Sequence, residues 1–211
     1  MARPSRHVDR ALLVAGRDLY AEGGAATLTV RRVAERAGAN PAMVRYHFGS
    51  RDAFLRQLLQ SIYEEMFADL EVAAGEPRSG SGERLRAALR VIARFVRDNR
   101  RLLAHLLRDA MSGEAAALDF ARANAPRHLG LVGRLVAEGQ REGALRAVPL
   151  PQALAFVAGA MGAPILAAAA IGGLAGVPSG IAQTLDDCVL SDAALDERID
   201  LVLAGLAARV P

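Results

Sequence analysis

The sequence predicts an all-α protein with a three-helix N-terminal head and a larger helical body. Apolar residues recur three and four positions apart along most of the chain, which is the period of a helix face. Glycine, proline and short polar runs interrupt that period and mark the helix ends. Hydrophobic residues make up 52% of the chain but aromatic residues only 4%, so the core must consist mainly of Leu, Val and Ala. We expect about nine helices, divided between a domain of residues 1–54 and a domain of residues 55–211.

The head begins with a helix over residues 8–21, which buries a stripe that includes Leu12 and Leu19. Two short helices joined by a tight turn follow. Gly38 ends the first of them, because glycine tolerates the left-handed conformation of a helix end. Asn40 and Pro41 suit the cap and the first position of the next helix. This pattern predicts a helix-turn-helix whose second helix is free to enter a DNA major groove.

The same segment resembles the DNA-binding signature of TetR-family (tetracycline-repressor-like) regulators. The resemblance rests on Ala34, on the pair Ala37-Gly38 and on the run Tyr46-His47-Phe48-Gly49-Ser50-Arg51-Asp52. It covers roughly the first quarter of the chain and is only general beyond it. Arg51 stands where the family usually carries Lys, and Arg45 stands where Tyr or Asn is common. The resemblance implies a homodimer that binds a double-stranded DNA operator, responds to a small-molecule effector and represses transcription.

We predict that the DNA contacts come from the helix-turn-helix and from the start of the following helix. Arg45 and Met43 are expected to face base edges. The residues expected to contact backbone phosphates are Thr29, Arg31, Tyr46, His47 and Arg51. Ala42 belongs to the same outward surface.

The charge distribution favours the same end of the chain. The segment from Met1 to Arg56 holds ten Arg and five acidic residues, a net charge of +5, whereas the whole chain carries only +3. The remainder is therefore slightly acidic, at −2, and the head is the part suited to nucleic acid. The single Cys, Cys188, excludes an intramolecular disulfide, and the N-terminus has no apolar leader, so we expect a cytoplasmic protein.

The body is predicted to consist of helices alone. Apolar residues keep helical period over residues 51–74, so one long helix connects the two domains. The arginines of the next helix, among them Arg86, Arg90, Arg94 and Arg97, are interpreted as a solvated face. The further helices are expected over residues 83–98, 101–111, 115–142, 151–171 and 192–209.

No charged residue occurs from Ala147 to Leu185. Such a run is compatible with a membrane span, but Pro164 and the many Gly and Ala residues favour a buried helix kinked at Pro164, and we expect no membrane association. The last helix carries an apolar stripe with alternating spacings of four and three. We predict that this stripe forms the dimer interface through Leu195, Ile199, Val202 and Leu206.

Catalysis has no support in the sequence, and we expect neither enzymatic activity nor a cofactor or metal. The four His residues lack metal-ligand spacing, and the phosphate-binding and nucleophile motifs are absent. We expect instead a site in the body for a small apolar ligand that releases the repressor from its operator. Its predicted lining is Phe67, Phe95, His105, Asp109, Met111, His128, Phe156 and Met161. The rival hypothesis is a small-molecule-binding helical protein whose helix-turn-helix is not used for DNA.

Overall fold

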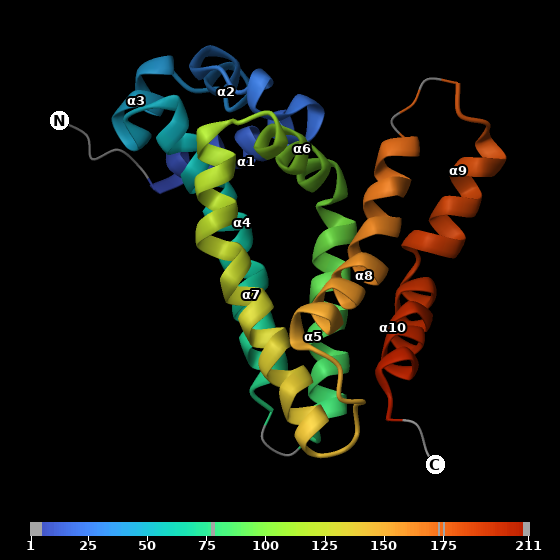
Figure 1. The fold of residues 1–211 in the computed structure, drawn as a ribbon. Coiled ribbons are helices and arrows are strands. Elements are labelled where there is room, and N and C mark those ends of the chain that lie inside the picture. The colour runs from blue at the N-terminus through green and yellow to red at the C-terminus, as the bar shows by residue number, and fades with distance from the viewer. Residues whose placement is uncertain (1–5, 77–78, 173, 175, 209–211) are drawn as a thin grey trace. The chain divides into compact units, whose positions relative to one another are not determined.

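The computed structural model describes residues 6–76, 79–172, 174 and 176–208. Over these ranges the chain forms ten α-helices and no β-strand, which confirms the all-α prediction (Figure 1). The helices are α1 (Arg6–Gly23), α2 (Val30–Arg36), α3 (Pro41–Phe48), α4 (Arg51–Ala74), α5 (Ser81–Asp98), α6 (Arg100–Met111), α7 (Ala115–Arg141), α8 (Leu150–Gly172), α9 (Ser179–Leu185) and α10 (Asp192–Leu206). A 3₁₀ turn, η1 (Gly24–Thr27), follows α1, and a π-helical turn, η2 (Asp186–Leu190), follows α9.

The chain divides into two compact units. The first contains residues up to Glu64 together with Arg101–Ala123, and the second contains Glu65–Arg100 and the chain from Asn124 onward. Helices α4 and α7 each begin in the first unit and end in the second. The functional boundary expected after residue 54 remains a prediction.

The first unit is built around the buried stripe of α1. Leu12 and Leu19 are fully buried, as is Phe54 at the start of α4. Gly16 lies between them, and a Cβ at this position would come within 2.5 Å of the Phe54 ring. Phe48, the last residue of α3, packs edge-on against the Phe54 ring at a centroid distance of 4.9 Å. The three head helices and α4 therefore share one core.

The second unit buries the apolar stripe of α10. Leu195, Ile199, Val202 and Leu206 are each at most 3% exposed in the single chain, and α10 packs against α5 and α8. A side chain inside the protomer is not available to a second protomer. The prediction that these four residues form the dimer interface is therefore wrong, because the stripe is filled by helices of its own chain.

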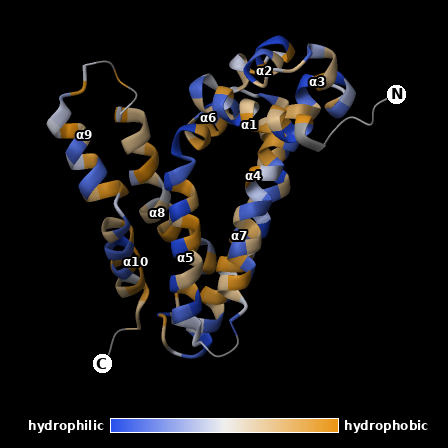
Figure 2. Ribbon diagram, turned by 180° about the vertical axis from the view of Figure 1, so that it is seen from behind, coloured by the Kyte–Doolittle hydropathy of each residue, from blue (hydrophilic) through white to orange (hydrophobic). Residues whose placement is uncertain are grey.

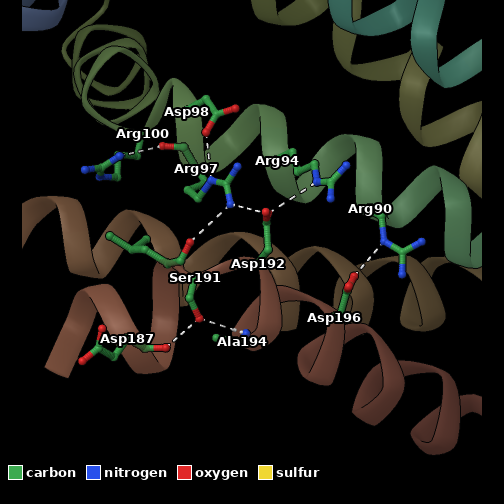
Figure 3. Close-up of polar contacts among 11 residues, drawn as sticks. Arg90, Arg94, Arg97, Asp98, Arg100, Asp187, Ser191, Asp192, Ala194 and Asp196 are labelled. Carbon is green, nitrogen blue, oxygen red and sulfur yellow. Dashed lines mark hydrogen bonds and ion pairs between the residues drawn. The ribbon is translucent and has the colours of Figure 1, made fainter. Parts of the chain in front are cut away.

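Ion pairs flank this packing (Figure 3). Arg90 of α5 binds Asp196 of α10 at 2.7 Å, and Arg97 binds Asp192 at 2.6 Å. Arg94 approaches the same Asp192 carboxylate at 3.5 Å. Arg86, one turn before Arg90 on α5, pairs with Asp200, one turn after Asp196 on α10. The α5 arginines are thus a row that faces the aspartates of α10, and not only a solvated face. The guanidinium of Arg97 also lowers the pKa of Asp192.

Helix α8 is apolar on all sides and continues through Pro164 without a break (Figure 2). It is the one helix of the described chain whose length and composition would allow it to cross a membrane, although the core helix of a soluble protein passes the same test. Its buried residues, which include Val157, Met161 and Ile165, lie on one face. Phe156 is 43% exposed on another face. The charge-free helix therefore has one face in the core and one apolar face uncovered.

Candidate nucleic-acid interface

Local caps position the two helices of the helix-turn-helix. The Thr29 hydroxyl accepts a hydrogen bond from the backbone N–H of Arg32 at 3.2 Å and begins α2. The Asn40 side chain accepts from the N–H of Ala42 at 2.8 Å and begins α3, with Pro41 at its first position. Gly38, in the turn between them, has φ +63°, a conformation that side chains with a Cβ rarely adopt. These are the features on which the sequence prediction rests.

Packing of α2 on α3 leaves an outward surface on α3. Val33 and Ala34 of α2 are buried, as are Val44 and Phe48 of α3. The opposite side of α3 carries Ala42, Arg45 and Tyr46, all exposed, and the Tyr46 side chain is 68% exposed. Arg45 has no hydrogen bond or ion pair with any described residue. A guanidinium held on a helix without an internal partner is available to an external acceptor such as the edge of guanine.

The other residues predicted to contact DNA differ in their exposure and in their contacts within the protein. Thr29 is exposed and so is Arg31, although Arg31 already pairs with Glu35 at 2.7 Å. Met43 is half-buried. His47 is also half-buried, its ring lies edge-on to Tyr46 at 5.2 Å, and its Nε2 is buried without a hydrogen-bond partner. The contacts of these side chains to DNA remain predictions.

Arg51 is more engaged within the protein than its sequence motif indicates. Its Nε donates to the carbonyl of Leu28 at 3.1 Å, and a terminal nitrogen donates to the carbonyl of Ala25 at 2.6 Å. The other terminal nitrogen lies 3.0 Å from Asp52 and 3.5 Å from Glu114. Arg51 therefore fastens the start of α4 to the segment before α2. The expected phosphate contact must compete with, or add to, these bonds.

The segment from Ala21 to Leu28, which contains the last turn of α1 and the connection to α2, is also held by α6. The buried Asp109 carboxylate accepts from the backbone N–H of Ala25 at 2.8 Å, and Arg108 donates to the carbonyl of Gly23 at 3.1 Å. His105 bonds the backbone of Ala21, while burial lowers the pKa of its imidazole. His105 and Asp109 of α6, predicted as ligand contacts, thus both contact the segment that precedes α2.

Tyr20 adds a buried hydroxyl to this cluster. The residue is fully buried, and its hydroxyl has no hydrogen-bond partner of acceptable geometry. Burial raises the pKa of Tyr20 above its ordinary value of 10.0, and the neighbouring Asp109 carboxylate raises it further. The Tyr20 phenol therefore stays neutral wherever the protein is folded at ordinary pH.

The other predicted ligand contacts lie in different places. Met111 is 81% exposed and belongs with His105 and Asp109 to the first unit. The second unit holds Phe67, Phe95, His128, Phe156 and Met161. Among these, Phe67 and Met161 are buried, the Arg127 guanidinium lies 4.1 Å from the centre of the Phe67 ring, and burial lowers the pKa of His128. The eight residues are therefore divided between the two units, and their contacts to a ligand remain predictions. The described residues contain no cluster of three His, Cys, Asp or Glu side chains suited to a metal.

Comparison with known families identifies the head. Residues 12–58 match the family model described as bacterial regulatory proteins, tetR family. Over these residues, which form the head, the chain is similar to TetR-family regulators. The matched residues run from α1 through the helix-turn-helix into α4 and include every predicted DNA contact. Comparison with curated protein sequences gives no match.

Solved structures extend the likeness to the TetR-family fold as a whole. The TetR-family regulator PfmR from Thermus thermophilus shares 21% identity, with a TM-score of 0.69 over 92% of this chain and 97% of that one. FadR from Bacillus subtilis, solved with stearoyl-CoA, shares 14% identity, with a TM-score of 0.71 over 93% and 98%. The ketosteroid regulator KstR2 of Mycobacterium tuberculosis shares 16% identity, with a TM-score of 0.70 over 99% and 98%. The chain thus shares the fold of these three structures over nearly its whole length.

Proposed function

We propose that this protein is a dimeric transcriptional repressor that binds its operator through α3 and leaves it when an apolar small molecule binds the body. The observation that carries the proposal is the outward surface of α3, on which Arg45 has no partner among the described residues and Tyr46 is largely exposed. A helical protein that did not use this surface would gain nothing from an unpaired guanidinium there. Arg45 reads a base, and the surrounding residues hold the phosphates.

The test is selection of bound duplexes from a random DNA pool by the purified protein. A defined, two-fold symmetric sequence is the expected outcome, with half-sites about one helical turn apart. Arg45→Ala should weaken binding to that sequence by about 1–3 kcal/mol while changing binding to random duplex much less. Arg31→Ala is the matched control, because Arg31 is exposed but paired and is expected to contact only phosphate. Selection of no sequence would instead favour the rival, a ligand-binding protein with an unused helix-turn-helix.

The dimer surface proposed in place of the buried stripe is the uncovered side of α8 and α10. Leu201 of α10 is 66% exposed and Phe156 of α8 is 43% exposed. The two helices lie close together, since a Cβ at Gly205 of α10 would come within 3.0 Å of the Phe156 ring. An apolar surface made by two packed helices, next to a charge-free run, is what an obligate homodimer interface requires.

The proposed effector is apolar because few polar side chains reach the interior of the second unit. Phe67, Phe95 and Met161 supply apolar wall, and His128 is kept largely neutral by the burial that lowers its pKa. Two of the structures with the same fold concern regulators whose names or bound molecules are lipid-like, stearoyl-CoA for FadR and ketosteroid for KstR2. Both chemistries are the first probes to try.

The contacts of α6 offer the path from effector to DNA. His105, Arg108 and Asp109 all hold the Ala21–Leu28 segment, which leads directly into α2. An effector shifts an equilibrium only by binding one arrangement better than another. A body that prefers a displaced α6 would draw on this segment and disturb the presentation of Thr29 and α3.

Release from the operator is tested by measuring operator affinity in the presence of stearoyl-CoA or a ketosteroid. The expected loss is roughly five- to 150-fold for a compound that also raises the melting temperature. Asp109→Asn should reduce the loss while leaving the increase in melting temperature unchanged, because the variant weakens the α6 contact and not the site. A compound that stabilises the protein but never changes operator affinity would contradict release by that compound.

A further inference from the structure

The head has a second surface that the DNA contacts do not use. An open groove of about 420 Å³ lies along the outer side of α1, and the end of α2, at Arg36 and Ala37, forms its far wall. The α1 residues that line it are Arg10, Ala11, Val14, Ala15 and Asp18. They recur at alternating spacings of one and three, so they form one face of the helix. Val14, at the centre of this face, is 56% exposed.

The two charges of the α1 face are placed symmetrically about Val14. Arg10 precedes it by four residues and Asp18 follows it by four. No hydrogen bond or ion pair with another described residue occupies the Arg10 guanidinium or the Asp18 carboxylate, although Asp18 acts at a distance on Arg36. The order along the helix is therefore cation, apolar residue, anion, at equal spacings of about 6 Å.

Such a face is complementary to itself. When two copies of α1 cross in opposite directions about a two-fold axis at Val14, Arg10 of each copy lies opposite Asp18 of the other. The two Val14 side chains then meet at the axis, which is the pairing that an isologous contact requires. Ala11 beside them is exposed and small, and Ala15 lies buried beneath the face, so no bulky side chain keeps the helix axes from approaching to about 8 Å. A reversed crossing would place like charges opposite each other.

We propose that the α1 face joins the heads of two copies of this protein in a two-fold contact, separate from the proposed α8–α10 dimer surface. The partner that fits this face is a second copy of the protein, because in an antiparallel pair each Arg10 lies opposite an Asp18. The contact area of one helix face is small, so the contact is weak between free molecules. It acts where DNA already holds two heads as neighbours, because effective concentrations there reach the millimolar range. Neighbouring sites on DNA are then filled cooperatively.

The first experiment places a cysteine at the axis. In the Cys188→Ser background, Val14→Cys brings two thiols together, because disulfide formation needs Cβ atoms about 3.8 Å apart. The protein is saturated onto long random-sequence duplex DNA and oxidised mildly, and a second sample is oxidised at millimolar concentration without DNA. Ala26→Cys, at an exposed position of η1, is the matched control. Rapid disulfide linking of the Val14→Cys protein and slow linking of the Ala26→Cys protein are expected in both samples.

The second experiment exchanges the charges in the Val14→Cys, Cys188→Ser background. Arg10→Asp alone, or Asp18→Arg alone, places like charges opposite each other and should slow linking about tenfold. The two changes together restore the complementary pairs and should restore the rate. Equal rates in all four proteins, or linking no faster than that of the Ala26→Cys control, would overturn the proposal. Loss without restoration in the double variant would also overturn it, and would indicate that the face receives a different protein.

The contact between α1 faces does not depend on the proposed recognition of an operator, and the use of random-sequence duplex keeps the two tests separate. A protein that selects no specific sequence can still show the linking pattern, and a sequence-specific repressor can lack it. The substituted positions of the head are all exposed, so circular dichroism should show unchanged helix content.

Discussion

Two side chains in the first unit, Asp109 and Arg51, bind backbone groups that are far away in the sequence. Asp109 reaches across 84 residues of chain to cap the N–H of Ala25, and Arg51 reaches back 26 residues to the carbonyl of the same residue. Sequence spacing could not reveal either contact, because it reports only neighbours on one helix. The spacing of His105 and Asp109 predicts that they share a helix face, but it carries no information about what that face meets.

Arg51 allows its structural and DNA-binding contributions to be separated. Arg51→Ala should lower the free energy of unfolding by about 2 kcal/mol, because two backbone carbonyls lose a charged donor that is only partly exposed. It should also weaken specific and random DNA binding alike and reduce the salt dependence. Arg51→Lys should keep the salt dependence but lose part of the stability, since an ammonium cannot span both carbonyls. Urea unfolding and binding titrations at several salt concentrations measure the two effects. An unchanged salt dependence in Arg51→Ala would remove Arg51 from the DNA contacts.

Tyr20 should make the protein sensitive to alkali. Its pKa is raised above 10.0 in the folded protein, so the unfolded chain ionises first as the pH rises. Stability is therefore fully present below pH 10 and should fall progressively above it. Tyr20→Phe should remove that part of the loss and cost little near pH 7, because the hydroxyl has no good hydrogen bond to lose. Melting temperatures of the two proteins from about pH 7 to 11 provide the comparison. Parallel curves would show that Tyr20 does not contribute.

At the scale of elements, the sequence predicts the features that depend on neighbouring residues, such as helix caps and turns. The caps at Thr29 and Asn40, the turn at Gly38 and the outward side of α3 all lie where the residue pattern places them. The stripe of α10 is also recognisable from the sequence as a packing surface. Periodicity identifies such a face but not its partner, and the partner is α5 and α8 of the same chain. The arginine row of α5 has the same ambiguity, because its aspartate partners lie about a hundred residues away.

Two neighbouring residues of α10 distinguish core from dimer surface. Val202→Asp places a charge where the side chain is 2% exposed and should destabilise the fold by more than about 3 kcal/mol. Leu201→Asp changes a side chain that is 66% exposed, so it should leave the protomer folded but separate the dimer. Sedimentation and thermal unfolding of both variants test the assignment. A folded, monomeric Val202→Asp protein would return the interface to the apolar stripe.

For the whole molecule, the uneven charge decides how binding responds to salt. The head carries the excess of arginine, while the rest of the chain is slightly acidic and should not hold DNA. If a dimer makes about 6–10 phosphate contacts, its affinity should fall by about 10³–10⁵ between 50 and 200 mM salt. The monomeric Leu201→Asp protein should show about half the slope, because it offers one head. An equal slope for both would mean that one head makes all the contacts.

Helix α4 has a mechanical consequence. It is unbroken from Arg51 to Ala74, with its first residues in one compact unit and its last in the other. Its 24 residues span about 36 Å. A rigid rod of that length, tilted by about 5° around its far end, swings its near end by about 3 Å, the length of one hydrogen bond. The near end is Arg51, which holds the segment leading into α2. Angular changes too small to repack a core are therefore large enough, at the tip of this lever, to make or break individual bonds.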